Sequence, residues 1–485
     1  MKFTLGINAF NHDASVCLVE PSFNQVLFAA HAERYSRIKN DSLLNEDIIE
    51  DALGWGFPTE ICWFEKPSLR WTRQVRSGQF PKFYSIKKML NKFGLGELPV
   101  YTQHHHQAHA AQAFYSSGMK HAGILVIDAI GEWTTTSIYT AYRNKLERKF
   151  VSYYPNSMGL FYSAVTHALG YKPNEEEYIV MGMAAYGQAK YVKELKELYF
   201  SSFAPPNFKL KQNLHRGLKL NPQWDPYNVA ASAQAIWSEY MVGTALWMKR
   251  TLGTTNLIIA GGGALNCSAN GDIRQTGIFD EIYVPPNPGD AGLALGAIAA
   301  HYQKPLLMSH AYLGYNIRGR VPIDGVISLL EAGEVVAIAN GRAEWGPRAL
   351  GNRSLLADPR REDARDRVNA IKGREGFRPF APAVLDEHAD TVFEMDHNNM
   401  DYMQFAVRCY DPVAYPAICH IDGTSRVQTV RKDNISVLRP ILEAWYAKTG
   451  CPMLLNTSLN VKGEPMVNTW ADAVRFSRIN NIMVF

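Results

Sequence analysis

Short apolar runs alternate with longer mixed stretches along the first part of the chain, and several of the runs end in Gly, Asp or Asn. Runs rich in Val, Ile and Leu are typical of strands buried in a sheet. The stretches between them are long enough for helices, so the pattern predicts an α/β architecture in which strands lead into functional turns. The expected strands are 4–7, 15–19, 25–30, 124–128, 136–141 and 256–260.

The texture of the sequence changes near residue 320. Residues 306–321 are punctuated by glycine and only weakly periodic, which indicates a connection between domains. Further strands are expected beyond it, at 335–339 and 427–430. A chain of 485 residues also exceeds what one hydrophobic core usually serves. The sequence therefore predicts one domain over residues 1–320 and a second over residues 321–485.

Composition narrows the class of protein. Hydrophobic residues make up 47% of the chain and charged residues 20%, which is typical of a globular protein. No apolar run approaches the roughly 20 residues needed to cross a bilayer, so no membrane segment is expected. The beginning of the chain does not resemble a secretory signal, and the six cysteines include no C-x-x-C pair. We expect a cytoplasmic protein with free thiols, whose oligomeric state is open, a homo-oligomer included.

Four histidines in six residues open an alanine-rich stretch. Two of them, His105 and His109, stand four residues apart, and on a helix this spacing puts both imidazoles on one face. Asp128 ends an expected strand and Asp290 stands directly before a small-residue helix, where side chains point into the cleft of an α/β domain. Such a set suits Fe, Mn or Zn, with positions left for a substrate oxygen. The alternatives are a polar helix end for the histidines and turn or capping roles for the aspartates.

A strand that runs into three glycines and then a helix forms a candidate phosphate site. Backbone N–H groups in such a turn can approach a phosphate closely, and the helix N-terminus favours the anion. A tight turn without a ligand also needs glycine, so both interpretations stay open. The residues are Gly261, Gly262, Gly263 and Asn266. His12, in the turn between the first two strands, is a candidate general base if that turn faces the same cleft.

Turns in the second part of the chain gather arginine, lysine, serine and asparagine beside glycine and proline. Guanidinium and ammonium groups bind phosphate, while amide and hydroxyl groups fix its orientation. We therefore expect these residues to bind phosphate or carboxylate-like groups, with ordinary surface charge as the alternative. The candidates are Arg348, Arg353, Ser354, Lys372, Arg378, Arg426, Asn456, Ser458 and Asn460.

Taken in order, these motifs resemble the O-carbamoyltransferases of the nodulation and antibiotic-tailoring type. The resemblance implies an actin-like ATPase-fold domain, similar to the tRNA threonylcarbamoyl transferase, followed by a YrdC-like α/β domain. At residue 129 this chain has alanine where the family usually has glycine. The matching stretches are 12–15, 33–37, 105–111, 128 with 131–132, 181–187, 261–266, 290–292, 341–354, 378–382, 422–430 and 455–460.

The same resemblance implies a reaction in two steps. In the second domain, carbamoyl phosphate is converted to carbamate, which attacks the α-phosphate of ATP and gives carbamoyl adenylate and pyrophosphate. Arg348 and Lys372 are the expected catalytic residues there, because their charges would neutralise phosphoryl oxygens. In the first domain the metal polarises the carbamoyl group, His12 takes the proton of an acceptor hydroxyl, and AMP leaves. The implied cofactors are ATP with Mg²⁺, and Fe(II) at the metal site with Mn or Zn as alternatives.

Two stretches rich in basic and aromatic residues bear on the acceptor. Residues 66–92 hold eight Lys or Arg and no acid, with four aromatic residues among them, and residues 198–224 have a similar composition. This composition suits phosphate contacts and base stacking, with an ordinary basic face as the alternative. We expect the acceptor to be the 5-hydroxymethyl group of 5-hydroxymethylcytosine in DNA, in a single strand or flipped from a duplex. The alternatives are a small-molecule hydroxyl such as a sugar or an antibiotic, tRNA modification of the threonylcarbamoyl type, and a non-catalytic scaffold.

Overall fold

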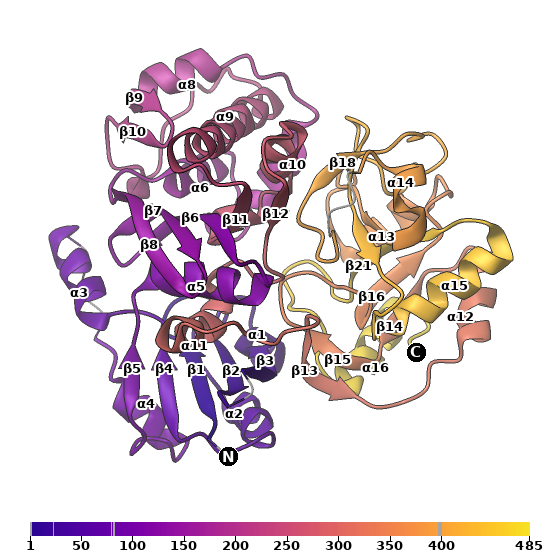
Figure 1. Ribbon diagram of the computed structural model, residues 1–485. Helices are drawn as coiled ribbons and strands as arrows, with labels where there is room; N and C mark the ends of the chain where they lie inside the picture. Colours follow the sequence, from indigo (N-terminus) through magenta and orange to yellow (C-terminus); the bar gives the residue numbers. More distant parts are fainter. Residues whose placement is uncertain (1, 23, 79, 81–82, 396–399) are drawn as a thin grey trace. The chain divides into compact units, whose positions relative to one another are not determined.

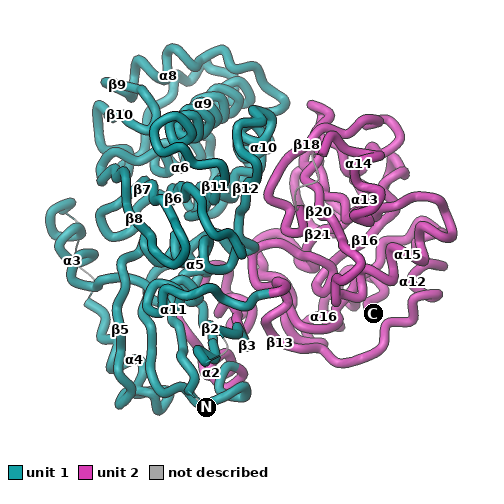
Figure 2. Tube along the Cα trace, viewed as in Figure 1, with its two compact units in different colours: residues 1–27, 52–308 teal, residues 28–51, 309–485 magenta. Residues whose placement is uncertain are grey.

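The chain folds as two compact units in the computed structural model, which describes residues 2–22, 24–78, 80, 83–395 and 400–485 (Figures 1 and 2). The first unit comprises residues 1–27 and 52–308, and the second comprises residues 28–51 and 309–485. The sequence pattern did not reveal that residues 28–51 group with the C-terminal part. The domain limits of 1–320 and 321–485 remain a prediction.

Two five-stranded sheets share one topology, and their strands belong to the first unit except for residues 28–31 at the end of β3. In the first sheet the strand order is β3-β2-β1-β4-β5, with β1 antiparallel to β2 and parallel to β4. In the second the order is β12-β11-β6-β7-β8, with β6 antiparallel to β7 and parallel to β11. The strands are β1 (Thr4–Asn8), β2 (Ser15–Glu20), β3 (Gln25–His31), β4 (Glu60–Trp63), β5 (Val100–Thr102), β6 (His121–Gly131), β7 (Thr134–Tyr142), β8 (Lys145–Tyr153), β11 (Asn256–Ala260) and β12 (Glu281–Tyr283).

This repeated connectivity is the duplicated arrangement of an actin-like ATPase domain, so the predicted α/β fold is confirmed. In each half, a central strand is flanked by antiparallel and parallel neighbours, and its carboxyl end leads into a turn that carries predicted site residues. The expected strands of the first part all form, within one to three residues of their predicted limits. Their Val, Ile and Leu side chains are buried except for Leu27, as expected for sheets covered by helices.

Helices α5 (His105–Ser117) and α11 (Leu293–Tyr302) pack against each other, with α11 on β1 and α5 on β6 and β11. The two helices approach closely because small residues line their contact. A Cβ on Gly296 of α11 would lie 2.4 Å from the carbonyl oxygen of Ala108 in α5. A Cβ on Gly6 in β1 would lie 1.8 Å from the carbonyl oxygen of Ala294. Glycine at these two positions therefore sets the distance of α11 from both of its neighbours.

The remaining elements of the first unit surround the two sheets (Figure 1). None of the helices in the described part of the chain combines the length and hydropathy needed to cross a lipid bilayer. The helices are α3 (Pro67–Arg76), α4 (Ile86–Lys92), α6 (Met158–Ala168), α7 (Glu177–Ala184), α8 (Val192–Tyr199), α9 (Pro226–Leu252) and α10 (Cys267–Gln275), and a hairpin is formed by β9 (Phe200–Ala204) and β10 (Asn207–Leu210).

The structure corrects the interpretation of residues 198–224 as a base-stacking surface. Phe200 and Phe208 are buried, with ring centroids 6.2 Å apart, and Phe208 lies 5.3 Å from the buried ring of Tyr240. These aromatic side chains belong to the core beside α9, so they cannot stack on a nucleobase. In contrast, Trp71 and Phe83 of the first basic stretch are 39% and 76% exposed.

The second unit is built on a mixed sheet with the strand order β14-β16-β21-β17-β20. Its neighbours are antiparallel except for the parallel pair β17 and β20. Two small sheets pair β13 with β15 and β18 with β19. The strands are β13 (Tyr312–Ile317), β14 (Val336–Ala339), β15 (Gly341–Glu344), β16 (Arg353–Ala357), β17 (Ala381–Leu385), β18 (Ala406–Arg408), β19 (Thr424–Arg426), β20 (Gln428–Val430) and β21 (Met453–Ser458), and the helices are α1 (Ala32–Ser36), α2 (Glu46–Leu53), α12 (Ile323–Glu331), α13 (Ala364–Lys372), α14 (Ala389–Val392), α15 (Leu438–Thr449) and α16 (Trp470–Asn480).

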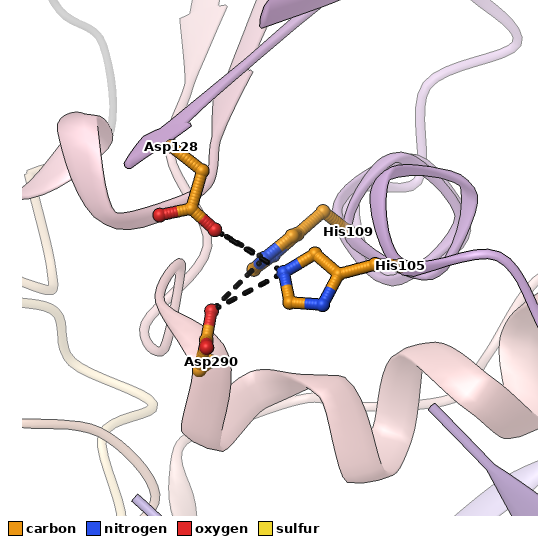
Figure 3. A group of neighbouring side chains, drawn as sticks. All are labelled: His105, His109, Asp128 and Asp290. Carbon is orange, nitrogen blue, oxygen red and sulfur yellow. Dashed lines mark hydrogen bonds and ion pairs between the residues drawn. The ribbon is translucent and has the colours of Figure 1, made fainter. Parts of the chain in front are cut away.

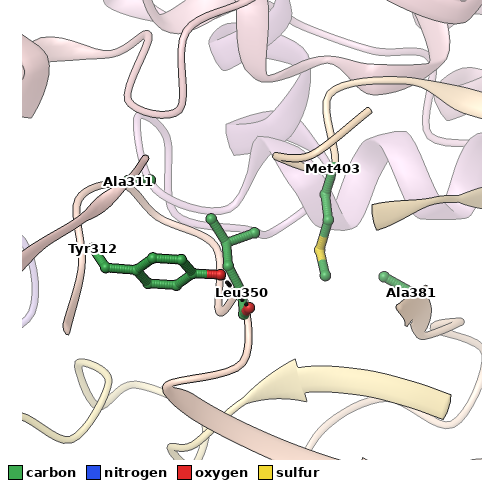
Figure 4. Close-up of a cluster of buried hydrophobic side chains, with 5 residues drawn as sticks. All are labelled: Ala311, Tyr312, Leu350, Ala381 and Met403. Atoms are coloured by element: carbon green, nitrogen blue, oxygen red, sulfur yellow. Dashed lines mark hydrogen bonds between the residues drawn. The ribbon is translucent and has the colours of Figure 1, made fainter. Parts of the chain in front are cut away.

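Residues 306–321, which the sequence indicated as a connection, contain strand β13. The strand was not recognised because its partner β15 lies 24 residues farther on and the register shifts between Tyr312 and Asn316. Tyr312 packs in a buried cluster with Leu350 and Met403, and its hydroxyl donates a hydrogen bond of 3.0 Å to the carbonyl of Leu350 (Figure 4). This contact anchors the arginine-rich segment between β15 and β16.

Two arginines attach residues 28–51 to the rest of the second unit. The guanidinium of Arg34 is buried and donates a 2.7 Å hydrogen bond to the carbonyl of Gly346. Arg37 donates hydrogen bonds of 2.6 and 3.0 Å to the carbonyls of Met466 and Pro465. Charge-assisted bonds to main-chain carbonyls explain why this segment groups with residues far away in sequence.

The close approach of α5 and α11 gives a prediction for stability. We expect Gly296→Ala to lower the free energy of unfolding by about 1–3 kcal/mol, because the new methyl group meets the Ala108 carbonyl in a packed interior. The matched control is Gly325→Ala in α12, where the nearest atom, on Pro322, is 3.9 Å from the added Cβ. There the better helix propensity of alanine should raise stability by up to about 1 kcal/mol. Chemical denaturation followed by circular dichroism measures both changes, and equal stability of the two variants would refute the explanation.

Candidate active site and metal centre

The histidine pair stands in the first two turns of α5. His104 precedes the helix in an extended conformation, so His105 begins it and His109 follows one turn later on the same face. Their side chains are 1% and 0% exposed, and their ring centroids lie 4.9 Å apart. Figure 3 shows both imidazoles pointing away from the helix axis toward the two aspartates. The predicted helical spacing of the pair is therefore realised in a buried setting.

Asp128 is aimed at the histidines by an irregularity in strand β6. Pairing of β6 with β7 is regular up to Ile127 and resumes at Gly131, so the intervening residues leave the ladder. A Cβ on Gly131 would lie 2.3 Å from the ring of His105, which makes glycine necessary there. The backbone of Ala129 does not adopt a left-handed conformation, so alanine fits where the family usually has glycine.

The four side chains converge on one small space. The Nε2 atom of His105 lies 3.2 Å from Asp128 Oδ2 and 3.5 Å from Asp290 Oδ1. The Nε2 atom of His109 lies 3.6 Å and 3.4 Å from the same two oxygens. One donor atom from each residue lies within 4.8 Å of the other three. The four predicted ligands are thus brought together from three separate parts of the first unit (Figure 3).

Electrostatics in this space favour a bound cation. Two carboxylate charges that lie within 4.8 Å of each other repel by roughly 3 kcal/mol or more at an effective dielectric constant of about 20. Burial opposes ionisation of Asp290, but the neighbouring His105 holds the pKa of that carboxyl well below its usual range. Burial would likewise lower the pKa of His105, yet the two aspartates raise it well above the ordinary value. A proton on His105 thus offsets part of the negative charge of the two carboxylates. A divalent cation bound at this site would do the same.

His109 gives the test of whether these residues fit a metal. Neither of its ring nitrogens makes a hydrogen bond with any described residue, although both atoms are buried. A buried polar atom without a partner is costly and uncommon in native proteins. Ligation of a metal by Nε2 accounts for that atom, and two imidazoles with two carboxylates are a donor set that Fe, Mn and Zn accept. The four residues therefore fit a divalent transition metal.

The turn after β1 places His12 beside this group. Its Nε2 atom lies 3.6 Å from Asp290 Oδ2, and its Nδ1 atom lies 2.8 Å from the carboxylate of Asp13. The Asn11 amide donates a 2.9 Å hydrogen bond to Asp290 Oδ2, while Asn8 donates to the main-chain carbonyls of Asp13 and Asp290 at 2.9 Å each. Asn8 and Asn11 were not singled out from the sequence, although their position directly after a buried strand was a signal for them.

The charge on His12 depends on the same carboxylates. Partial burial would lower its pKa, but Asp290 and Asp13 outweigh this and raise the pKa to about 10. His12 therefore holds a proton as long as the charge of Asp290 is not shared with a cation. If Asp290 held a metal ion, its attraction for the imidazolium would fall, and the pKa of His12 would move back toward its ordinary value.

The glycine turn lies directly against the end of β6. Gly261 has a left-handed backbone (φ 86°), and a Cβ there would lie 2.2 Å from the carbonyl oxygen of Ile127. A Cβ on Gly262 would lie 3.2 Å from Asp128 Oδ1, so the turn borders the metal group. Gly263 would meet the Ile127 side chain at 2.6 Å. Close packing against β6 thus requires glycine at positions 261 and 263, whether or not a phosphate also binds there.

Asn266 serves as the cap of α10 in this structure. Its Oδ1 accepts a 3.0 Å hydrogen bond from the N–H of Ala269, and its amide exchanges two bonds with Gln234. This is the arrangement that stabilises a helix N-terminus. The expected role of Asn266 in nucleotide binding stays a prediction.

In the second unit, three predicted residues converge at the end of β21. Lys372, the last residue of α13, is buried, and its Nζ donates hydrogen bonds to the hydroxyl of Ser458 at 3.1 Å and to the side chain of Asn460 at 2.9 Å. It also donates to the main-chain carbonyls of both residues. All four acceptors are neutral, so the ammonium group has no counter-charge among its hydrogen-bond partners.

The electrostatics around Lys372 favour an anion. Burial, together with the nearby guanidinium groups of Arg374 and Arg378, holds the pKa of Lys372 well below its ordinary value. Lys372, Arg374 and Arg378 bring three basic groups together, and the hydrogen-bond partners of the lysine are neutral. A phosphate group bound there would supply the missing negative charge. Glu375 offsets part of this charge, with a carboxylate oxygen 3.5 Å from Arg378.

The structure corrects the assignment of Arg353 to phosphate binding. Its side chain is fully buried, and its guanidinium donates to the main-chain carbonyls of Asn340, Asn352 and Asn468 among others. A guanidinium fork committed in this way cannot turn to a ligand without breaking several buried bonds. Arg353 was predicted to bind phosphate because it stands beside glycine and asparagine. Arginines that donate hydrogen bonds to main-chain carbonyls have the same sequence neighbours.

The side chains of two other predicted residues also make hydrogen bonds within the protein. The hydroxyl of Ser354 accepts a 3.0 Å hydrogen bond from the N–H of Gly351, and Asn456 donates bonds of 3.1 and 2.7 Å to Ala349 and Gln428. Both side chains are buried. Their hydrogen bonds stabilise the segment that precedes β16. None of these bonds connects them to Lys372.

Arg348 and Arg426 are partly exposed, the first in the segment between β15 and β16 and the second at the end of β19. Their roles remain predictions. Glu344 was not assigned a role from the sequence, yet its carboxylate accepts three main-chain hydrogen bonds, from Leu350, Asn352 and Arg353, at 2.8 to 3.1 Å. It fixes the course of this segment.

Comparison with known proteins identifies the family. Residues 73–299 match the family model described as carbamoyltransferase N-terminus, and residues 327–485 match the model described as carbamoyltransferase C-terminus. The chain is 32% identical to nodulation protein NolNO of Sinorhizobium fredii, with 96% of this chain and 77% of that protein covered. It is 32% identical to nodulation protein NolO of Bradyrhizobium diazoefficiens over 76% of this chain and 75% of that one. Nodulation protein U of Sinorhizobium fredii is 35% identical over 53% and 49%.

Among solved structures, T. kodakarensis HypF covers 62% of this chain and 47% of its own, with 13% identity and a TM-score of 0.36. A ROK family glucokinase from Streptomyces griseus covers 62% of this chain and 99% of its own, with 14% identity and a TM-score of 0.32. The fold assignment accordingly depends on the strand topology described above. The two matched regions and the similarity to NolNO show that this chain belongs to the carbamoyltransferase family and is a carbamoyl-transferring enzyme.

Proposed function

We propose that the enzyme is an ATP-dependent O-carbamoyltransferase that uses carbamoyl phosphate and passes through carbamoyl adenylate. The observation that carries this proposal is the buried group of two histidines and two aspartates with His12 at its side. That arrangement can activate a carbonyl and deprotonate a hydroxyl in one place, which is the chemistry of acyl-type transfer to an alcohol.

The second unit would form the adenylate. Carbamoyl phosphate loses its phosphate to water, and an oxygen of the resulting carbamate attacks the α-phosphorus of ATP while pyrophosphate leaves. Lys372, with Ser458 and Asn460 fixing its position, would neutralise charge on the phosphoryl oxygens, and Arg378 would add a second positive charge. ATP would enter with Mg²⁺. A YrdC-like fold for this unit is part of the proposal.

The first unit would transfer the carbamoyl group. His12 takes the proton of the acceptor hydroxyl as its oxygen attacks the carbamoyl carbon, and the bond to the adenylate oxygen breaks to release AMP. His105, His109, Asp128 and Asp290 would hold a divalent cation, with Fe(II) as our first choice, and this ion would supply Lewis-acid activation of the carbamoyl group. Asn11 keeps Asp290 in place beside His12 through its 2.9 Å hydrogen bond.

The acceptor we propose is the 5-hydroxymethyl group of 5-hydroxymethylcytosine in DNA. Support comes from the exposed aromatic side chains of residues 66–92, since Trp71, Phe80 and Phe83 are 39%, 96% and 76% exposed among basic residues. Exposed rings beside cations suit stacking of bases along a single strand. Carbamoylation of a small-molecule hydroxyl is the alternative, and tRNA modification of the threonylcarbamoyl type is a further one.

Replacing a histidine of the metal group should separate the two steps. We expect His109→Ala to lower metal affinity by about 10-fold or more and to abolish carbamoylation of the acceptor, while carbamoyl adenylate still forms. Metal content by mass spectrometry and adenylate by chromatography measure the two effects. His121→Ala, an exposed histidine at the start of β6, is the control and should keep its metal. Metal retention in His109→Ala would argue against the proposed ligand set.

The lysine of the second unit gives the complementary result. We expect Lys372→Met to slow pyrophosphate release from ATP and carbamoyl phosphate by about 10²- to 10³-fold, because a positive charge next to the phosphoryl oxygens is lost. Metal content should stay as in the wild type. Lys448→Ala on α15, which is exposed, controls for the general loss of a lysine. An unchanged rate in correctly folded Lys372→Met would place adenylate formation elsewhere.

Nucleoside mass analysis tests the acceptor. Hydroxymethylated single-stranded and double-stranded DNA are incubated with the enzyme, ATP and carbamoyl phosphate, and the digested nucleosides should gain the mass of one carbamoyl group. Sugars and antibiotic alcohols are assayed in parallel. Mass gain on one of these, with none on DNA, selects the small-molecule alternative. Dependence on threonine and bicarbonate instead of carbamoyl phosphate selects the tRNA-type reaction.

A further inference from the structure

Helix α3 (Pro67–Arg76) carries a row of three arginines, of which the first two are partly buried and the last is exposed. Arg70, Arg73 and Arg76 recur every three residues, so their side chains follow one side of the helix. Arg70 donates hydrogen bonds of 3.0 Å to the buried carboxylate of Glu65 and 2.9 Å to the main-chain carbonyl of Phe10. This side of the helix is therefore not an ordinary solvated basic face.

The contacts of Arg70 connect α3 to the His12 turn. Phe10 precedes His12 by two residues, has a left-handed backbone (φ 69°), and stacks on Tyr84 with ring centroids 4.4 Å apart and planes at 3°. The Arg70 guanidinium lies 5.4 Å from the centre of the same Tyr84 ring. The inward side of α3 therefore borders the turn that carries the proposed general base.

Arg76, at the other end of the row, lies over the indole of Trp133 at 5.8 Å. Trp133 follows Glu132, whose carboxylate accepts a 2.7 Å hydrogen bond from the N–H of Lys66 at the start of α3. The first and last arginines of the row thus each have a partner, and contacts at both ends hold the helix in place.

Arg73, in the middle of the row, has no such partner. Its Nε atom is buried and makes no hydrogen bond, and no carboxylate lies within ion-pair distance of its guanidinium in the described ranges of the chain. Glu65, the carboxylate that influences it, is already paired with Arg70 at 3.0 Å. Burial and the charge of Arg70 both disfavour the positive charge of Arg73 and lower its pKa. A partly buried guanidinium without a counter-ion is costly unless a ligand supplies the negative charge.

The groups around Arg73 suit a phosphate ligand. His215 and Tyr154 lie within the electrostatic reach of Arg73, and their rings contact each other with centroids 6.4 Å apart. A tyrosine hydroxyl and an imidazole can donate hydrogen bonds to phosphoryl oxygens, and the flanking arginines contribute positive charge. Trp71 and Phe83, on the same stretch of chain, have ring centroids 5.6 Å apart and are exposed.

We propose that Arg73 is the centre of an acceptor subsite that binds a phosphate group of the molecule to be carbamoylated. The acceptor would then be a phosphate-bearing hydroxyl compound, either a nucleotide or the backbone of a single nucleic-acid strand. The proposal rests on the carbamoyl transfer proposed above, because the subsite borders the His12 turn. The proposal narrows the acceptor to phosphate-bearing compounds. It assigns Arg73 to the acceptor, because adenylate formation from ATP and carbamoyl phosphate is proposed to take place in the second unit.

Equilibrium binding tests the subsite without relying on turnover. The probes are 5-hydroxymethyl-2′-deoxycytidine 5′-monophosphate, the corresponding nucleoside, and a short single-stranded oligodeoxynucleotide, measured by calorimetry or fluorescence anisotropy. We expect Arg73→Ala to weaken binding of a phosphate-bearing probe by about 10- to 100-fold, as for loss of one charge-assisted contact, and to leave nucleoside binding unchanged. Arg73→Lys should retain part of the affinity. For the oligonucleotide, the logarithmic salt dependence should also fall by about one unit.

Arg250→Ala, at the exposed end of α9, is the matched control and should bind all probes as the wild type does. Loss confined to the monophosphate identifies a terminal phosphate as the ligand, and loss confined to the oligonucleotide identifies a phosphodiester. The proposal is overturned if Arg73→Ala affects neither phosphate probe, if nucleoside and nucleotide lose affinity equally, or if the wild-type enzyme binds neither phosphate probe. Absence of carbamoyl transfer in wild-type enzyme that shows the expected binding pattern would overturn the proposed function and leave the phosphate site intact.

Discussion

Two carboxylates within a few ångströms of each other, one buried and one largely so, are the constraint on which the first unit depends. Asp128 lies near the end of β6 and Asp290 in the segment between β12 and α11, and only compensation by positive charge makes their proximity tolerable. The histidines of α5 supply part of this charge when protonated, and a metal would supply all of it. The close contact of α11 with α5 at Gly296 matters for this reason, since it holds Asp290 and the histidine pair at a fixed separation.

The duplication also explains where the remaining groups stand. The turn after β1 carries Asn8, Asn11 and His12, and the irregular end of β6 carries Asp128, so the central strand of each sheet delivers its polar residues to the same group. In the second unit, by contrast, Lys372 donates hydrogen bonds to neutral acceptors at the end of β21. One unit therefore concentrates groups that suit a cation, and the other concentrates positive charge that suits an anion.

Much of this could be predicted from the sequence, and the failures have physical reasons. Buried strands of the first part were visible because apolar runs ended in polar turns, and the pair His105 and His109 was visible because helical spacing is local. Strand β13 was missed because its pairing depends on a distant partner. The internal role of Arg353 was missed because composition does not reveal whether a guanidinium faces a ligand or main-chain carbonyls. Whether an arginine such as Arg73 has a counter-ion is likewise decided by the tertiary structure and cannot be predicted from local sequence.

The carboxylate of Glu344 occupies the position that a bound phosphate has in a phosphate-binding loop. Its carboxylate receives three main-chain N–H groups of the segment that follows it, which is the task a bound anion performs in a glycine-rich loop. The protein thus contains its own permanent substitute for an oxyanion at this place. These three hydrogen bonds fix the course of the arginine-rich segment from within the chain, so the partly exposed Arg348 is held in place before any ligand binds.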